Sequence, residues 1–185
     1  MRQLRSYTSI SLDGFFTDAR NDMSWAHKRE DEWNALTSSN ASGNAALLFG
    51  RVTYEQMKAF WPTPQAAQML PEVAKGMNAM PKYVVSRTLD AAVWQNTTVL
   101  KGDLVAQVQA LKATDGPDLV ILGSGSVVSQ LTEARLIDEY QLVLTAVVLG
   151  KGRTPFQTLS DPRTFTLTKT KSFRNGNVVL WYEPA

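Results

Sequence analysis

Two short, wholly apolar runs, each followed directly by a glycine, constrain the fold of this chain most. Ala45–Phe49 and Leu119–Leu122 contain no polar side chain, which is typical of strands that helices cover on both faces. Strand-like and helix-like segments alternate around them, as in a sheet flanked by helices. The pattern therefore predicts an α/β protein whose central strands are parallel.

Periodicity and helix-start signals predict the remaining elements. Further strands are expected at Leu4–Ser11, Lys82–Ser86, Thr97–Leu100 and Glu139–Leu149. Helices are expected at Glu30–Ser39, from a Thr53 cap to Phe60, at Gln65–Asn78, from an Asp103 cap through Leu104–Ala113, and from the turn after Leu122 to about Ala134. Threonine and aspartate suit the caps because their side-chain oxygens accept hydrogen bonds from the first amides of a helix.

The end of the chain has a different pattern. Thr164–Phe173 alternates apolar and polar residues, Asn175-Gly176 follows, and Val178–Tyr182 is another strand-like run. Asn-Gly between strands predicts a hairpin, because both residues tolerate positive φ. The expected architecture is a three-layer α/β/α fold with a mixed, mostly parallel sheet of roughly eight strands and a C-terminal antiparallel hairpin. All 185 residues are expected to form one domain.

Composition excludes several classes of protein. With no cysteine and one histidine, His27, the chain offers no disulfide framework and no thiolate or multi-histidine metal centre. Its 19 basic and 17 acidic residues give a net charge of +2, which predicts binding neither to nucleic acid nor to a membrane surface. The first residues lack the apolar stretch of a signal peptide, and no run approaches the ~20 apolar residues of a membrane span. We therefore expect a cytoplasmic protein.

The turn Gly123-Ser124-Gly125-Ser126 follows a buried strand and opens a helix. Small side chains let a phosphate approach the backbone, where free amides and the helix dipole favour negative charge. In an open α/β sheet such a turn lies at the carboxyl end of the strand, where ligands bind. A dinucleotide-binding fingerprint would need glycine at position 128, which is Val128. A phosphate site and a plain tight turn with a serine cap both remain open.

Arginine beside a hydroxyl side chain follows two other strands. Gly50-Arg51-Val52-Thr53 comes after one of them, and Ser86-Arg87 after the next. Such a pair suits the 2′-phosphate of NADP, because the guanidinium fork matches phosphate oxygens. Taken singly, each arginine is better explained as a solvated surface charge. The three strand ends together favour a dinucleotide site.

These segments resemble those of known enzymes. Leu47–Glu55 resembles the Gly-Arg-x-Thr segment of dihydrofolate reductases, and Tyr83–Arg87 resembles their next strand. Ser11–Gly14, Leu136–Tyr140 and Val148–Phe156 are more similar to the reductase C-terminal domain of bifunctional riboflavin-biosynthesis deaminase-reductases. The motifs stand in consistent order over nearly the whole chain, so the resemblance covers the entire expected domain.

The resemblance implies the dihydrofolate-reductase fold and an NADPH-dependent reductase of a small pyrimidine- or pterin-type heterocycle, similar to 5-amino-6-(5-phosphoribosylamino)uracil reductase and dihydrofolate reductase. It implies cofactor contacts from Ser9, Ser11, Phe16, Gly50, Arg51, Thr53, Ser86, Arg87, Gly123, Ser124, Gly125 and Ser126. By position, Ser86 and Arg87 would meet the adenosine 2′-phosphate, and the turn at 123–126 the pyrophosphate. Thr17–Asp22 would form a mobile loop over the nicotinamide. A homodimer with Tyr140–Leu149 in the contact is also expected.

The substrate side is less determined. Glu30, Asp31 and Thr145 are the candidate proton donors, with an ordered water as the alternative. Adjacent acids also suit a solvated helix start. The candidate aromatic rim for a flat substrate is Trp25, Trp33, Phe60 and Trp61, which are otherwise core residues. The competing class is a non-catalytic nucleotide-binding module that keeps the fold.

Overall fold

The computed structural model describes residues 1–28, 30–42 and 44–185, and it has the expected layers. Its main sheet has eight strands in the order β5-β4-β3-β6-β1-β7-β10-β9. Their bounds are β1 Leu4–Ser11, β3 Ala45–Gly50, β4 Lys82–Val85, β5 Thr97–Leu100, β6 Asp118–Leu122, β7 Glu139–Thr145, β9 Phe165–Ser172 and β10 Val178–Pro184. The strands from β5 to β7 in this order are parallel, whereas β10 and β9 are antiparallel.

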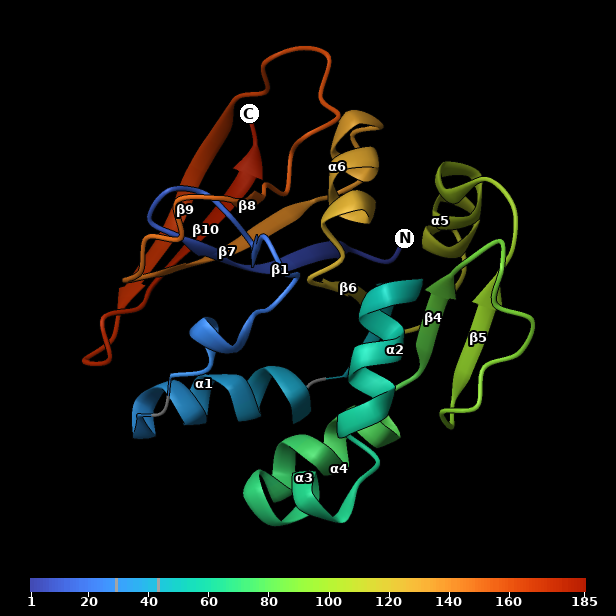
Figure 1. The fold of residues 1–185 in the computed structure, drawn as a ribbon. Helices are drawn as coiled ribbons and strands as arrows, with labels where there is room; N and C mark the ends of the chain where they lie inside the picture. The colour runs from blue at the N-terminus through green and yellow to red at the C-terminus, as the bar shows by residue number, and fades with distance from the viewer. Residues whose placement is uncertain (29, 43) are drawn as a thin grey trace.

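Helices cover both faces of this sheet (Figure 1). On one face, called the α1 face below, lie α1 (Asp31–Ser42), α3 (Pro64–Met69) and α4 (Pro71–Ala79), and on the other α5 (Leu104–Lys112) and α6 (Gly125–Glu133). Two further elements are η1 (Ser24–Ala26), before α1, and α2 (Arg51–Phe60), after β3. Within the described ranges, no helix is both long and apolar enough to span a membrane.

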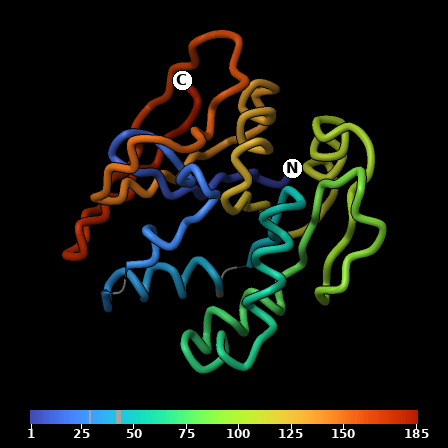
Figure 2. Tube along the Cα trace, in the orientation of Figure 1, coloured from blue at the N-terminus to red at the C-terminus, as the bar shows by residue number. Residues whose placement is uncertain are grey.

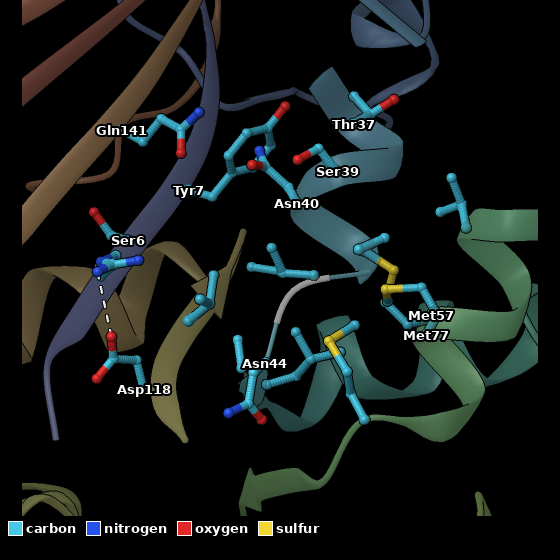
Figure 3. Close-up of a pocket in the computed structure, with 18 of the residues that line it drawn as sticks. Ser6, Tyr7, Thr37, Ser39, Asn40, Asn44, Met57, Met77, Asp118 and Gln141 are labelled. Carbon is cyan, nitrogen blue, oxygen red and sulfur yellow. Dashed lines mark hydrogen bonds and ion pairs between the residues drawn. The ribbon is translucent and has the colours of Figure 1, made fainter. Parts of the chain in front are cut away.

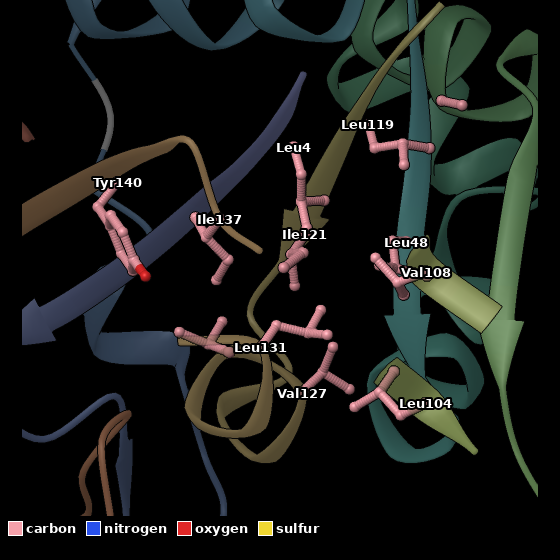
Figure 4. Packing of buried hydrophobic residues seen from close by; sticks show 12 residues of the cluster. Leu4, Leu48, Leu104, Val108, Leu119, Ile121, Val127, Leu131, Ile137 and Tyr140 are labelled. Atoms are coloured by element: carbon pink, nitrogen blue, oxygen red, sulfur yellow. The ribbon is translucent and has the colours of Figure 1, made fainter. Parts of the chain in front are cut away.

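Alternation along the strands assigns their side chains to the two layers. Leu4 of β1 and Ile121 of β6 pack with Leu131 of α6 in one fully buried cluster (Figure 4). On the α1 face, Phe49 of β3 packs with Tyr54 and Trp94 in a second cluster. The apolar β3 and β6 therefore serve both layers, which is the physical reason for their lack of polar residues.

The chain order reverses in the middle of the sheet. The chain leaves β1 through α1 and enters β3, and β6 later inserts between these two strands. Ligands of open α/β sheets bind at such a reversal, beyond the carboxyl ends of the strands. Figure 2 shows the loop after β1 running beside the segment after β7, where Leu12 donates its amide to the Val147 carbonyl at 2.8 Å. These segments also pair as β2 (Thr17–Asp18) and β8 (Gly152–Arg153).

Three expected boundaries are wrong for identifiable reasons. Thr53 does not cap α2. This helix begins at Arg51, with Gly50 as its N-cap. The expected helix over Gln65–Asn78 is two helices, because Pro71 has no amide to continue α3 and instead begins α4. The expected strand Glu139–Leu149 ends at Thr145, where its neighbour β1 also ends. The cap of Asp103 on α5 is confirmed by a 2.9 Å bond from the Ala106 amide.

The C-terminal hairpin is confirmed, although with a different turn. Gly176 is left-handed, with φ of 88°, and Asn175 is not. The turn closes through bonds from the Phe173 amide to the Asn177 carbonyl at 2.9 Å and from the Gly176 amide to the Phe173 carbonyl at 3.1 Å. The Asn175 side chain accepts the Asn177 amide at 2.9 Å. Because β10 pairs with β7, that strand has neighbours on both sides and cannot provide a strand edge to a second copy. Any contact between two copies through the strand part of Tyr140–Leu149 would have to use a face of the sheet, and the expected homodimer stays a prediction.

Candidate functional site

The carboxyl ends of β3, β4 and β6 and the start of α6 surround a pocket of about 370 Å³. We call it the arginine pocket, because Arg51, Arg87 and Arg153 lie in its wall. The predicted cofactor residues that line it are Phe16, Gly50, Arg51, Thr53, Ser86, Arg87, Ser124, Gly125 and Ser126. The structure thus brings the turns of three separate strands to one site, as the sequence predicted from the three strand ends taken together.

Ser124 joins two of these turns by hydrogen bonds. Its backbone is left-handed, with φ of 51°, and its hydroxyl does not cap α6. Instead, the hydroxyl accepts the Gly50 amide at 3.0 Å and donates to the Leu122 carbonyl at 3.1 Å. Gly123 is also left-handed and lies outside the pocket lining. The simple alternative of a serine-capped turn is therefore wrong, because the serine joins the ends of β3 and β6.

Phe16 forms the side of the pocket next to α6. A Cβ atom at Gly125 would lie 2.5 Å from the Phe16 ring, so only glycine lets the two segments pack this closely. The guanidinium of Arg153 lies 5.7 Å from the centre of the same ring. Pairing between β2 and β8 places both residues there, since Phe16 precedes β2 and Arg153 ends β8. The loop expected to close over a cofactor is therefore paired with a second segment.

The charges and donors of the arginine pocket fit a phosphorylated dinucleotide. Its described lining holds three arginines and one carboxylate, that of Asp103. The Arg51 guanidinium forms an ion pair with the Glu55 carboxylate, with 2.9 Å between Nη1 and Oε1, and Arg87 is exposed. The Thr17 hydroxyl is buried and has no hydrogen-bond partner among the described residues. The first amides of α6 have no intrahelical partners. Phosphate oxygens would satisfy all of these donors.

Ser9 and Ser11 do not line this pocket. Ser11 is fully buried, and its hydroxyl accepts the Phe15 amide at 3.0 Å and donates to Asp13 at 2.6 Å. The Asp13 carboxylate also accepts the Leu149 and Gly150 amides at 3.1 and 2.7 Å. The bond from Ser11, and then these amides, lower the Asp13 pKa. Ser11 and Asp13 therefore fasten the end of β1 to the loop after β7.

A second cavity, of about 570 Å³, lies on the α1 face. We call it the α1-face cavity. Its floor includes Tyr7 of β1 and Gln141 of β7, which are neighbours in the sheet, and Leu122 of β6. Its opposite wall includes Met57 and Met77 from the helices (Figure 3). The cavity is adjacent to the arginine pocket, since Leu122 lies two residues before Ser124.

The structure does not bring the candidate aromatic rim together. Trp61 lines the α1-face cavity, whereas Trp25, Trp33 and Phe60 line neither cavity. Trp33 is buried against Phe173, with ring centres 5.2 Å apart. The Trp25 indole donates to the Asp22 carbonyl at 3.1 Å. The rim expected from these four residues is thus reduced to Trp61.

The candidate proton donors lie in different environments. The Glu30 carboxylate accepts the amides of Glu32 and Trp33 at 2.9 and 3.1 Å, so it caps α1. Asp31 is exposed in the first turn of that helix. Thr145 is fully buried at the end of β7, and its hydroxyl has no partner among the described residues. None of the three lines either cavity.

Sequence reasoning missed several residues of both cavities. Arg153 was visible only within a family motif, and its place in the arginine pocket depends on the short β2–β8 pairing. Gln56 lines the same pocket from α2. Tyr7 and Gln141 carried no signal, because their proximity depends on the register between β1 and β7. No group of three or more candidate metal ligands occurs among the residues that the structure describes.

Comparison with known proteins bears on the family and the fold. A model of the RibD C-terminal domain family matches residues 2–179. The uncharacterized protein YyaP of Bacillus subtilis (strain 168) is 23% identical over 174 residues, covering 94% of this chain and 90% of that protein. The crystal structure of a putative riboflavin biosynthesis protein from Shewanella sp. PV-4 matches with a TM-score of 0.75 at 20% identity over 99% of each chain.

Dihydrofolate reductase from Enterococcus faecalis, solved with NADP(H), has the same fold. It matches with a TM-score of 0.63 at 13% identity, covering 98% of this chain and 96% of that one. At this identity the match concerns the fold alone. Since the family model spans nearly the whole sequence, the chain belongs to the RibD C-terminal domain family and has the dihydrofolate-reductase-like fold.

Proposed function

We propose that this protein is a reductase that binds NADPH in the arginine pocket and uses it to reduce a small conjugated heterocycle. The observation that carries the proposal is the convergence of three strand-end turns on a pocket with three arginines. NADPH has a pyrophosphate and a 2′-phosphate, and guanidinium groups complement phosphate oxygens in both charge and shape. Family membership supports the same reading.

Each phosphate has a fitting set of groups. The amides of Gly125 and Ser126 begin α6, where the helix dipole favours an anion, so we assign the pyrophosphate to this end. At the other end, the Ser86 hydroxyl accepts the amides of Thr88 and Leu89 at 3.2 and 2.9 Å. Its own proton is therefore free to donate to the 2′-phosphate beside Arg87.

The cofactor supplies the hydride when it is bound, and the protein must orient the two rings and exclude water. The substrate is assigned to the α1-face cavity, which is next to the arginine pocket. Consecutive residues of α2 support this assignment, since Gln56 lines the arginine pocket and Met57 lines the α1-face cavity. One helix would thus position cofactor and substrate together.

The proton is assigned to an ordered water held by Thr145. Burial of an unpartnered hydroxyl is costly, and a water molecule would satisfy it. The Glu30 carboxylate already accepts the amides of Glu32 and Trp33 and so caps α1. Glu30 is therefore assigned a structural role and Thr145 a role in proton supply.

Two measurements on the same protein test the proposal. Calorimetry measures NADPH binding, and absorbance measures NADPH oxidation with a panel of pterins and aminopyrimidines. Saturable binding with turnover of at least one heterocycle supports the reductase. Tight binding without turnover on any of them would favour the alternative, a non-catalytic nucleotide-binding module. Absence of NADPH binding would contradict both.

A further inference from the structure

The floor of the α1-face cavity is a regular array of side chains from neighbouring strands. Leu122, Tyr7, Gln141 and Trp181 occupy one row across β6, β1, β7 and β10, since each is paired with the next in the sheet. This row carries an amide, a phenol and two apolar groups, and none of the four is charged. A ligand lying on the row meets a flat and neutral surface.

The charges of this cavity lie near the amino ends of β1, β6 and β7, where one arginine faces two carboxylates. Arg5 is the only cation among the described lining residues. Its guanidinium lies 3.2 Å from Asp118 and 3.7 Å from Glu139, both of which also line the cavity. Lys169 lies over the Trp181 ring at 4.8 Å but is not part of the lining. A phosphate group that enters the cavity would meet two carboxylates, and the Arg5 guanidinium is already paired with them.

The neutral row has unused hydrogen-bonding capacity. The Gln141 Nε2 atom is buried and has no partner among the described residues. Tyr7 is its neighbour in the sheet, and burial raises the Tyr7 pKa above its ordinary value. The phenol therefore keeps its proton at physiological pH and can donate it. A buried donor without a partner costs stability, so a ligand acceptor here contributes to binding.

The part of the opposite wall that α2 and α4 form is apolar and adaptable, whereas α1 contributes polar side chains, among them Thr37 and Asn40. Met57, Met77 and Met80 line it together with Trp61. Methionine side chains adjust to irregular surfaces and contact aromatic rings favourably. In Figure 3 the labelled Met57 and Met77 lie on the helices, opposite the strands that carry Tyr7 and Gln141. A planar ring fits between such a wall and the floor.

We propose that the α1-face cavity selects an uncharged, planar heterocycle with a ring carbonyl and without a phosphate group. The Gln141 amide and the Tyr7 hydroxyl donate to the carbonyl, the methionine wall covers the ring, and the Asp118 and Glu139 carboxylates repel phosphorylated analogues. As the substrate class of the reductase this inference rests on the proposed function, but the binding preference itself does not.

A matched ligand pair tests the preference. The ligands are 5-amino-6-ribosylaminouracil and its 5′-phosphate, and lumazine serves as a smaller neutral ring. Calorimetry with the NADP⁺-saturated protein and with the free protein measures each dissociation constant without turnover. The expected result is that the unphosphorylated compound binds at least tenfold more tightly than its phosphate. Equal or tighter binding of the phosphate would overturn the inference, and so would failure of both neutral ligands to bind.

Two variants locate the effect. Gln141→Leu keeps the approximate size of the side chain and removes the donor, so neutral ligands should bind about tenfold more weakly. Gln109→Leu, on the exposed surface of α5, is the matched control and should change nothing. The double variant Asp118→Asn with Glu139→Gln frees Arg5 and should shift the preference towards the phosphate. Unchanged preference in that variant would contradict the assigned role of the carboxylates.

Failure of this inference is distinguishable from failure of the proposed function. If NADPH does not bind but the free protein still prefers the neutral ligand, the reductase proposal fails and the cavity inference stands. If NADPH binds and the phosphorylated ligand is preferred and reduced, the reductase proposal stands and the cavity inference fails. The Gln141→Leu variant must also retain wild-type thermal unfolding for its binding result to count as loss of the donor, which circular dichroism checks.

Discussion

The two cavities lie on either side of α2 and differ in the origin of their polar groups. The arginine pocket is built from turns, so that its charges and free amides stand at the ends of strands and at the start of α6. The α1-face cavity is built from strand interiors, so that its polar groups are side chains in register, and its charges are paired. One end of the sheet is thus suited to phosphates and the adjacent face to a neutral ring.

The largest expected effect comes from removing the arginine at the 2′-phosphate end of the arginine pocket. Arg87→Ala should weaken NADPH binding by roughly 1.5–3 kcal/mol, because a hydrogen-bonded charge on the 2′-phosphate is lost. NADH, which lacks that phosphate, should bind as it does to the unchanged protein. Isothermal titration with both nucleotides measures the difference. Arg174→Ala, an exposed arginine in the C-terminal turn, is the control. Equal losses for both nucleotides would contradict the assignment of Arg87.

The second prediction concerns a lysine behind the wall of the α1-face cavity. Lys82 is buried, and its ammonium donates to the carbonyls of Asn78 and Met80 at 3.1 and 2.6 Å. Burial lowers the Lys82 pKa to about 8. The unfolded chain therefore binds more protons than the folded one above that pH, so stability rises with pH. The gain between pH 8 and 10 should be about 2 kcal/mol.

Denaturant unfolding at several pH values measures this gain. Lys82→Met should abolish it, and Lys75→Met, which changes an exposed lysine of α4, should retain it. Above about pH 10 the trend should reverse, because burial also raises the pKa values of Tyr7 and Tyr140 and their ionisation then favours unfolding. A flat profile for the wild-type protein between pH 8 and 10 would contradict the burial of a charged Lys82.

A smaller effect tests the packing that shapes the arginine pocket. Gly125→Ala places a Cβ atom 2.5 Å from the Phe16 ring and should lower the free energy of unfolding by about 1–2 kcal/mol. NADPH binding should weaken in parallel, while neutral ligands of the α1-face cavity should bind normally. Adding Phe16→Ala restores the space and should recover part of the NADPH affinity. Loss of both ligands in Gly125→Ala would show that the two cavities are not independent.

The smallest effect concerns Glu30. Since its carboxylate caps α1, Glu30→Ala should lower stability by about 0.5–1 kcal/mol and leave turnover nearly unchanged. Thr145→Val, by contrast, should reduce turnover with little change in NADPH affinity. Steady-state kinetics combined with thermal unfolding separates the two roles. A large loss of turnover in Glu30→Ala with normal stability would assign the proton donor to Glu30.

The sequence predicts those parts of the molecule that depend on local pattern. The apolar runs of β3 and β6 and the alternation in β9 place these strands almost residue for residue. The strand-end turns also predict the arginine pocket, because parallel strands bring their carboxyl ends to one edge. The split between α3 and α4 was readable at Pro71, whose missing amide cannot continue a helix.

Other parts depend on tertiary contacts that local pattern does not contain. The β2 and β8 strands have two residues each, too few for any periodicity, yet their pairing brings Arg153 to Phe16. The neutral row of the α1-face cavity depends on the register of strands that are distant in sequence. Trp33 was a plausible rim residue by type, but its position on α1 directs it against Phe173 instead.

Calorimetric titration of the unmodified protein with NADPH, NADH and 2′-phospho-ADP-ribose tests the central claim most directly. The account predicts one saturable site for NADPH, comparable binding of the fragment that lacks nicotinamide, and clearly weaker binding of NADH. This order follows from placing the phosphates among Arg51, Arg87 and Arg153. Equal affinities for NADPH and NADH, or no binding of the phosphorylated fragment, would contradict it.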